Sequence, residues 1–196
     1  MKTKIAVISD VHANADALTV VLEELKNKNI DMTIFLGDIL TYGCQPIEVL
    51  SILKEYESEH PAIFIKGNHD QFYFDLQSSV KKSSYRLPKF VDESVNWTLE
   101  RISPLVLRDI FTWHDNYRIG NVYFSHANPF KYGDWSYIEK PNDLSRSFQE
   151  LRKRIKVYYS KTFIYLWIRA TLGKAYTELY KHCLFWGQDT SHRVQK

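Results

Sequence analysis

The segment KIAVISDVHANAD, residues 4–16, joins a short apolar run to a polar turn and the start of a helix. The run Ile5–Ile8 shows no alternation of polar and apolar residues, which is typical of a parallel strand covered on both faces. Asn14 can cap a following helix, and Asp16 suits its positive end. The next apolar residues recur at helical spacing and predict one buried stripe: Leu18, Val21, Leu22 and Leu25.

The same order of elements recurs further along the chain. A second apolar strand is predicted over residues 32–36, after which Pro46 opens a helix with apolar residues on its inward face. A third strand is predicted over residues 62–65. Strands that alternate with helices at this interval form right-handed crossovers, so we expect an α/β fold built on a parallel sheet.

The remaining residues are less regular. Residues 71–118 have mostly helical patterns and predict a cap inserted into the α/β unit. A fourth strand is predicted over residues 120–125, followed by a surface helix over residues 141–154.

Polar side chains follow each of the four predicted strands. Asp10 and His12 follow the first, Asp38 the second, Asn68 the third and His126 the fourth. Because the carboxyl ends of parallel strands share one edge of the sheet, we expect these side chains to converge. Carboxylate, imidazole and amide donors suit divalent ions such as manganese, iron, magnesium or zinc. A site with two metals roughly 3.5–4 Å apart needs a bridging carboxylate, for which Asp38 is the candidate.

Each of these residues also has a structural explanation when it is taken alone. An aspartate after a strand, such as Asp10 or Asp38, often forms a turn or caps a helix, and Gly37 and Gly67 can relieve tight turns. Agreement at four strand ends favours a metal site over four separate coincidences.

Four motifs occur in a fixed order: Asp-Val-His at 10–12, Gly-Asp-Ile-Leu-Thr-Tyr-Gly at 37–43, Gly-Asn-His-Asp at 67–70 and Ser-His at 125–126. With them the sequence resembles the calcineurin-like metallophosphoesterase superfamily, in particular its small prokaryotic phosphoesterases of the YfcE type, over roughly residues 4–130. The resemblance implies an α/β sandwich of two mixed sheets flanked by helices. It also implies a phosphoesterase domain over residues 1–155, with the helical cap at 71–118.

The resemblance further implies metal-dependent hydrolysis of a phosphomonoester or a phosphodiester. Asp10, His12 and Asp38 would hold one divalent metal ion, while Asp38, Asn68 and His126 would hold a second. Mn²⁺ is the first expectation, with Fe, Zn, Ni or Mg as alternatives.

By the same resemblance, His69 would face the leaving group of the substrate and Asp70 would orient it. Independently, a histidine beside a carboxylate keeps its proton more easily, so His69 can donate to a departing oxygen near neutral pH. The alternative is a surface ion pair of little energetic weight. The cap and the loop at residues 42–45 would set the substrate specificity.

Residues 156–196 differ in character from the rest, with seven basic and two acidic residues against a net charge of −2 over residues 1–155. The Gly-His-x-His strand end of the family is missing, and the nearest candidates are Gly187 and His192, with His182 a weaker alternative. Three accounts are open. His192 supplies a metal ligand in a variant site, the end is truncated or frame-shifted, or the basic and aromatic residues bind nucleic acid. We favour the second account.

Loss of the closing histidines would leave a degenerate, non-catalytic metal-binding or interaction protein, which is the alternative function. Missing strands would also expose a sheet edge and apolar surface, which predicts self-association into a homo-oligomer.

The overall composition, 44% hydrophobic and 25% charged, is that of a globular protein, and the net charge of +3 does not by itself indicate nucleic-acid binding. The longest apolar stretches fall short of the roughly 20 residues that a membrane span needs. Two cysteines and the absence of a secretory leader predict a location in the reducing cytoplasm. The expected partner is a phosphoric-ester substrate.

Overall fold

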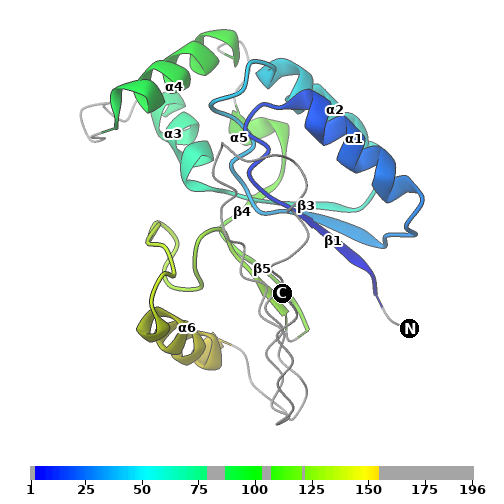
Figure 1. Cartoon of the computed structure of the whole chain (residues 1–196). Coiled ribbons are helices and arrows are strands. Elements are labelled where there is room, and N and C mark those ends of the chain that lie inside the picture. The colour runs from blue at the N-terminus through cyan, green and yellow to red at the C-terminus, as the bar shows by residue number, and fades with distance from the viewer. Residues whose placement is uncertain (1–2, 79–86, 103–106, 121, 155–196) are drawn as a thin grey trace. The chain divides into compact units, whose positions relative to one another are not determined.

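The computed structural model describes residues 3–78, 87–102, 107–120 and 122–154 (Figure 1). The chain divides into two compact units, residues 1–115 and 116–196. The described elements of the first unit are β1 (Ile5–Ile8), α1 (Ala15–Lys26), β2 (Met32–Phe35), α2 (Pro46–Glu59), β3 (Ala62–Ile65), α3 (Asn68–Gln77), α4 (Lys89–Ile102), α5 (Leu107–Ile110) and β4 (Trp113–His114). Those of the second are β5 (Tyr117–Ile119), β6 (Val122–Phe124) and α6 (Pro141–Arg154).

The first unit is built on a four-stranded parallel sheet in the order β1-β2-β3-β4. The three strands predicted from the sequence are present, and Phe35 pairs with Ile8 on one side and with Phe64 on the other. Because the strands follow one another in order, right-handed crossovers bring the connecting helices to one face of the sheet. Figure 1 shows α1 and α2 side by side on that face.

The fourth strand of this sheet was not expected from the sequence. β4 lies inside the stretch 71–118, which the helical pattern had described as a cap, and it pairs in parallel with β3. A strand of two residues is too short to show a period of its own, which is why the pattern missed it. The division of the chain at residue 155 stays a prediction.

The core lies between the sheet and its helices. The Phe35 and Phe64 rings stack at 4.9 Å between centroids, and Phe111 stacks on Phe64 at 4.1 Å. Leu18 and Leu22 of α1 are buried against this core. Val21 was predicted to join them but is 42% exposed, because the buried face of α1 follows the i, i+4 and i+7 positions that start at Leu18.

The helices begin directly after the polar turns. The Asn14 side chain accepts a hydrogen bond from the N–H of Ala17 at 2.9 Å and caps α1, as the sequence predicts. Pro46 occupies the first turn of α2. Each turn is therefore held between a buried strand and a helix that packs on the core.

The second unit contains a two-stranded antiparallel sheet, β5-β6, in which Arg118 pairs with Tyr123. The strand predicted over residues 120–125 corresponds to β6, but it pairs with β5 in this hairpin and not with the parallel sheet. After the hairpin, the buried Asn128 side chain donates to the carbonyls of Asp134 and Ser136, at 2.7 and 2.9 Å. These bonds hold the loop that leads towards α6.

Residues 156–196 lie outside the described residues. The predictions that fall on them, namely the altered end, the nucleic-acid surface, His182 and His192, therefore stay predictions. Among the described residues, no helix combines the length and the apolar character that a membrane crossing requires.

Candidate metal centre

The turns that follow β1 and β2 are tied together through their backbones. The N–H groups of Asp10 and His12 donate to the carbonyls of Gly37 and Asp38, at 3.0 and 2.9 Å. These bonds continue the pairing of the two strands beyond their ends. The first two polar turns therefore meet at the carboxyl edge of the sheet, where the sequence predicts them.

Several residues of these turns have left-handed backbone conformations. The φ angle is 55° at Asp10, 48° at His12 and 54° at Asp38, and it is also positive at Thr41 and Tyr42. This region costs an ordinary residue roughly 1–2 kcal/mol. Such residues persist only where the surrounding contacts fix them, and they cluster at functional sites.

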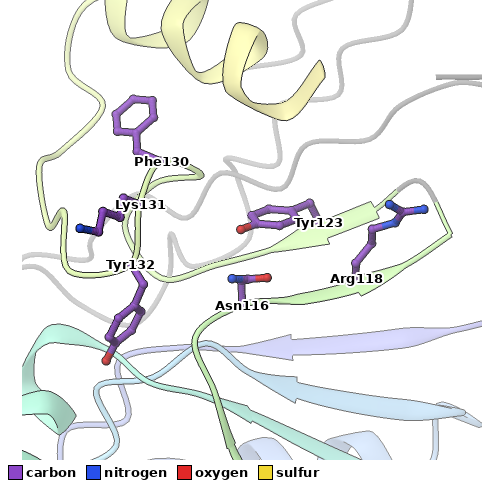
Figure 2. A pocket seen from close by; sticks show the side chains of 6 residues that line it. All are labelled: Asn116, Arg118, Tyr123, Phe130, Lys131 and Tyr132. Carbon is purple, nitrogen blue, oxygen red and sulfur yellow. The ribbon is translucent and has the colours of Figure 1, made fainter. Parts of the chain in front are cut away.

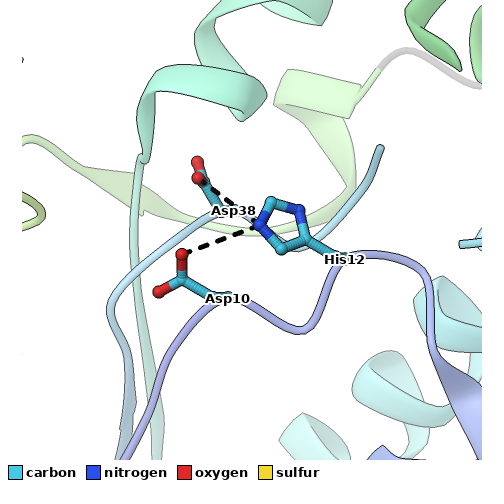
Figure 3. Close-up of side chains that lie close together, drawn as sticks. All are labelled: Asp10, His12 and Asp38. Atoms are coloured by element: carbon cyan, nitrogen blue, oxygen red, sulfur yellow. Dashed lines mark ion pairs between the residues drawn. The ribbon is translucent and has the colours of Figure 1, made fainter. Parts of the chain in front are cut away.

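Asp10, His12 and Asp38 form a group whose ligand atoms all lie within 4.8 Å of one another (Figure 3). The Nε2 atom of His12 lies 3.6 Å from Oδ1 of Asp10 and 3.9 Å from Oδ2 of Asp38. Carboxylate oxygens combined with an imidazole nitrogen are ligands that divalent transition metals accept. The structure thus brings together three of the residues that the sequence singled out.

The His12 ring is oriented by a backbone carbonyl. Its Nδ1 atom lies 3.1 Å from the carbonyl oxygen of Leu40. A carbonyl oxygen only accepts hydrogen bonds, so Nδ1 carries the proton and Nε2 of the neutral ring keeps its lone pair on the side of the carboxylates. A partner of this kind holds a ligating histidine in one orientation.

The electrostatics of the cluster favour a bound cation. Burial, together with the negative charge of Asp70, raises the pKa of the Asp38 carboxyl group well above its ordinary value. Burial alone would lower the pKa of His12, but the protonated ring can donate from Nε2 to Asp10 and is favoured by the negative charge of Asp38, so the pKa is raised. A divalent ion among these groups offsets the repulsion between the carboxylates, so the donor set fits such an ion.

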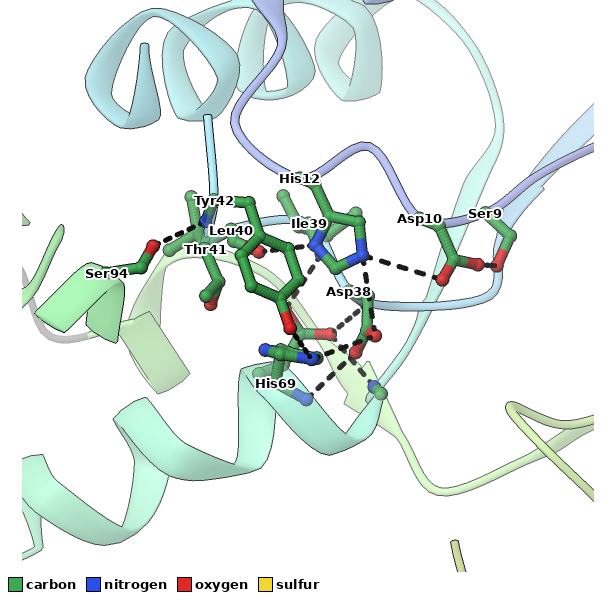
Figure 4. A network of polar contacts seen from close by, with 12 residues as sticks. Ser9, Asp10, His12, Asp38, Ile39, Leu40, Thr41, Tyr42, His69 and Ser94 are labelled. Atoms are coloured by element: carbon green, nitrogen blue, oxygen red, sulfur yellow. Dashed lines mark hydrogen bonds and ion pairs between the residues drawn. The ribbon is translucent and has the colours of Figure 1, made fainter. Parts of the chain in front are cut away.

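Asp70 joins the turn after β3 to the turn after β2. Its Oδ2 atom accepts hydrogen bonds from the N–H groups of Asp38 and Gly67, at 2.7 and 2.9 Å, and its Oδ1 atom accepts from Ile39 at 3.0 Å. In return, Oδ1 of Asp38 accepts from the N–H of His69 at 2.9 Å (Figure 4). The side chain of Asp70 is fully buried. This exchange of bonds fixes the position of Asp38.

Two glycines allow the turns to approach so closely. A Cβ atom on Gly37 would lie 2.3 Å from the backbone nitrogen of Gly67, and one on Gly67 would lie 2.1 Å from Oδ1 of Asp38. No side chain fits at either position without moving the turns apart.

His69 lies beside the cluster, near the start of α3. Its Nε2 atom is 4.0 Å from Oδ2 of Asp38 and 3.4 Å from the hydroxyl oxygen of Tyr42. Asn68, the first residue of α3, immediately precedes it. The hydrogen bonds that Asp70 accepts from Asp38, Ile39 and Gly67 come from backbone amides and hold the turns in position. The catalytic assignments of His69 and Asp70, and the ligand role of Asn68, stay predictions.

His126 belongs to the second unit, two residues beyond β6, where its ring packs against Trp135 with 5.9 Å between centroids. The argument from a shared sheet edge is wrong for this residue, because β6 is not a strand of the parallel sheet. Its ligand role rests on the Ser-His motif alone and stays a prediction.

Sequence reasoning missed how the site is held together. The Gly-Asn-His-Asp stretch places Asp70 at the third position of α3, and its side chain accepts from the N–H of Gly67 in a capping interaction. An acidic residue at the third position of a helix, three after the capping residue, is a signal that was open to sequence analysis. The contact between Tyr42 and His69 joins residues 27 positions apart and leaves no such local signal.

The second unit has a pocket of about 420 Å³ (Figure 2). Two cationic and three aromatic side chains line it together with one amide: Asn116, Arg118, Tyr123, Phe130, Lys131 and Tyr132. Arg118 donates from Nε to the carbonyl of Gly120 at 2.8 Å, and the Arg146 guanidinium lies over the Phe130 ring.

Comparisons with known proteins extend the resemblance. The sequence matches the family model of the calcineurin-like phosphoesterases over residues 3–193, which reaches beyond residues 4–130 and into the segment that the sequence analysis set apart. An uncharacterised protein of Methanocaldococcus jannaschii is 31% identical over 148 residues, which cover 70% of this chain and 55% of that protein.

Solved structures show the same fold. The crystal structure of a metallophosphoesterase from Sphaerobacter thermophilus aligns with a TM-score of 0.57 and 25% identity, over 76% of this chain and 57% of that one. A hypothetical protein from Pyrococcus horikoshii aligns with a TM-score of 0.66 and 18% identity, over 78% of this chain and 66% of that one, a likeness of fold alone. The chain spans less than two thirds of the length of each of these relatives. On the match of residues 3–193 to the family model, the chain belongs to the calcineurin-like phosphoesterase family.

Proposed function

We propose that this chain is a metal-dependent hydrolase of phosphoric esters. The observation that carries the proposal is the group Asp10, His12 and Asp38, held at the carboxyl edge of a parallel sheet in a member of this family. A divalent ion bound there supplies a Lewis acid that activates water and neutralises charge on a phosphoryl group. Mn²⁺ is the proposed ion, with Fe, Zn, Ni or Mg as alternatives.

The proposal includes a second divalent ion, with Asp38 as the shared ligand. Asn68 and His126 are its further proposed ligands because they stand at the family positions of their motifs. In support, Oδ2 of Asp38 lies 3.9 Å from His12 and 4.0 Å from His69, so this carboxylate has a histidine on either side. The backbone of His69, next to Asn68, bonds directly to the same carboxylate.

His69 is proposed as the proton donor to the leaving oxygen. Its imidazole is close to the donor group yet lies 5.2 Å from the His12 ring between centroids, in an edge-to-face arrangement. A ring beside the metal ligands can reach the departing oxygen of an ester whose phosphoryl group sits among them. Asp70 is proposed to act through the backbone, by holding Asp38 and the start of α3 in register.

The test measures metal and turnover together. The purified chain is analysed for bound metal and assayed with added Mn²⁺ on bis(p-nitrophenyl) phosphate and on p-nitrophenyl phosphate, which separates diester from monoester hydrolysis. We expect bound metal and turnover that a chelator removes and Mn²⁺ restores. The exposed residue Asp109 of α5 offers a matched control, since Asp109→Asn changes the same chemical group in a residue that is not part of the group Asp10, His12 and Asp38.

A folded chain that holds no metal and hydrolyses neither ester would overturn the proposal. That result would support the alternative, a degenerate protein that keeps the fold of the family without its activity.

A further inference from the structure

A series of aromatic rings leads away from the metal-binding group. The Tyr42 ring lies 4.8 Å from the His12 ring and 4.9 Å from the His69 ring, measured between centroids. The same ring stacks with Phe90 of α4, at 6.3 Å and with 21° between the planes. Phe90 is 65% exposed. The series therefore begins at the candidate metal ligands and ends at a ring that solvent reaches.

Two polar contacts hold Tyr42 in this position. Its N–H donates to the Ser94 hydroxyl at 2.7 Å, and its own hydroxyl lies 3.4 Å from Nε2 of His69 (Figure 4). Its φ angle of 67° is in the left-handed region, which is strained for an aromatic residue. Ser94 and Phe90 are four residues apart on α4 and so share one face of that helix. One helix face thus fixes the Tyr42 backbone and extends its ring surface.

Phe90 differs from a singly exposed apolar residue, which is common on protein surfaces. Its ring is in contact with Tyr42, and the Tyr42 ring is in contact with His12 and His69, so the exposed ring continues an aromatic surface that begins at the candidate metal ligands. Aromatic rings bind other rings by stacking, and they do so with little loss of side-chain freedom when they are already fixed, as Tyr42 is.

We propose that Tyr42 and Phe90 form a stacking surface for an aromatic group of the substrate, so that the preferred esters are those of aryl alcohols or nucleosides. This inference rests on the proposed function, because it takes the phosphoryl group to lie at Asp10, His12 and Asp38. With the leaving oxygen at His69, the organic group next to that oxygen meets the Tyr42 ring first and Phe90 further out. An aliphatic group cannot stack on these two rings, so it would gain much less binding affinity from them.

The kinetic test compares two phosphate monoesters whose leaving groups have the same pKa, one an aryl alcohol and the other a fluorinated alkyl alcohol. We expect Phe90→Leu to lower kcat/KM for the aryl ester about 3- to 10-fold, mainly through KM, and to leave the alkyl ester unchanged. Tyr137→Leu is the matched control, since Tyr137 is also an exposed aromatic residue, at 57%, and lies in the other unit.

A binding test separates this inference from the proposed function. Calorimetry on the Mn²⁺-loaded chain measures the affinities of phenylphosphonate and ethylphosphonate, neither of which is hydrolysed. We expect phenylphosphonate to bind more tightly to the wild-type chain, and this preference to fall in Phe90→Leu and to be kept in Tyr42→Phe. Tyr42→Phe retains the ring and removes only the hydroxyl.

The outcomes are distinct. A phenyl preference that Phe90→Leu removes supports the stacking surface, even if no ester is hydrolysed and the proposed function fails. Equal affinities for the two phosphonates, or an equal loss of both in Phe90→Leu, would overturn the stacking surface while leaving phosphoester hydrolysis in place.

Discussion

Asp70 holds Asp38 through the backbone: Oδ2 of Asp70 accepts a hydrogen bond from the N–H of Asp38 at 2.7 Å, while both carboxylates are buried. The two side chains therefore oppose each other electrostatically, yet one fixes the position of the other. Asp38 can thus serve as a negatively charged metal ligand, and its position is fixed by Asp70 whether or not a cation is bound.

Replacement of Asp38 tests the electrostatic part of this arrangement. Burial and the neighbouring Asp70 raise the pKa of Asp38, so its charge destabilises the metal-free chain at neutral pH. We expect Asp38→Asn to lower bound metal to near zero while the metal-free variant unfolds at the same or a higher urea concentration than the metal-free wild type. The same metal content in Asp38→Asn and in Asp109→Asn would contradict the assignment of Asp38 as a ligand.

Replacement of Asp70 tests the backbone hydrogen bonds that hold Asp38 in place. The two carboxylate oxygens of Asp70 accept hydrogen bonds from the N–H groups of Asp38, Gly67 and Ile39. Asparagine in Asp70→Asn has only one acceptor oxygen at this position. We expect a loss of about 2–4 kcal/mol in the free energy of unfolding, because buried amides lose their partners. Urea titration of the metal-free variant measures this loss, and calorimetry should show weaker Mn²⁺ binding as well. A variant with wild-type stability would show that the backbone bonds are unimportant.

Replacement of His69 separates catalysis from metal binding. In His69→Asn the N–H that donates to Asp38 is a backbone group and is retained, so the metal content should stay as in the wild type. We expect turnover to fall about 10²- to 10⁴-fold, and most for esters with poor leaving groups, because the proton donor is lost. If the metal is lost together with the activity, His69 is itself a ligand.

The close approach of the turns is tested at two glycines that both have positive φ angles. Gly37→Ala places a Cβ atom 2.3 Å from the backbone nitrogen of Gly67, whereas a Cβ atom at Gly120 has no atom of the described residues within 4 Å. We expect Gly120→Ala to lower the free energy of unfolding by about 1–2 kcal/mol, because alanine is strained in the left-handed conformation. Gly37→Ala should lower it clearly more and should also weaken Mn²⁺ binding. Equal costs in thermal unfolding would show that the turns can separate freely.

The buried Tyr73 phenol makes the stability of the chain depend on pH. Burial raises the pKa of its phenol, whose oxygen lies 2.7 Å from the Thr41 hydroxyl. The folded chain thus keeps the neutral phenol at pH values where the unfolded chain ionises it. The stabilisation of the folded state by the neutral Tyr73 phenol is complete below about pH 10 and falls as the pH rises above that value. We expect the stability advantage of the wild type over Tyr73→Phe to shrink by about 1.4 kcal/mol between pH 8 and pH 11.

That experiment has a built-in control at the lower pH. At pH 8 the wild type should be more stable than Tyr73→Phe by about 1–2 kcal/mol, because the variant leaves the Thr41 hydroxyl without this partner. A difference that is the same at both pH values would mean that the phenol ionises as readily in the folded chain as in the unfolded one.

The sequence by itself determined the strands β1, β2 and β3, the cap of α1 and the convergence of Asp10 and His12 with Asp38. These features follow from spacing over a few residues and from the rule that parallel strands end at one edge of a sheet. The ordered motifs also determined the family.

Only the tertiary structure decided the rest. It placed the two-residue β4 in the parallel sheet and β6 outside it, tied Asp70 to the amides of Asp38 and Ile39, and set Tyr42 between His69 and Phe90. The physical reason is the same in each case: these contacts join residues that are distant in the sequence, and their geometry depends on how the strands and helices pack, which no local pattern of residues encodes.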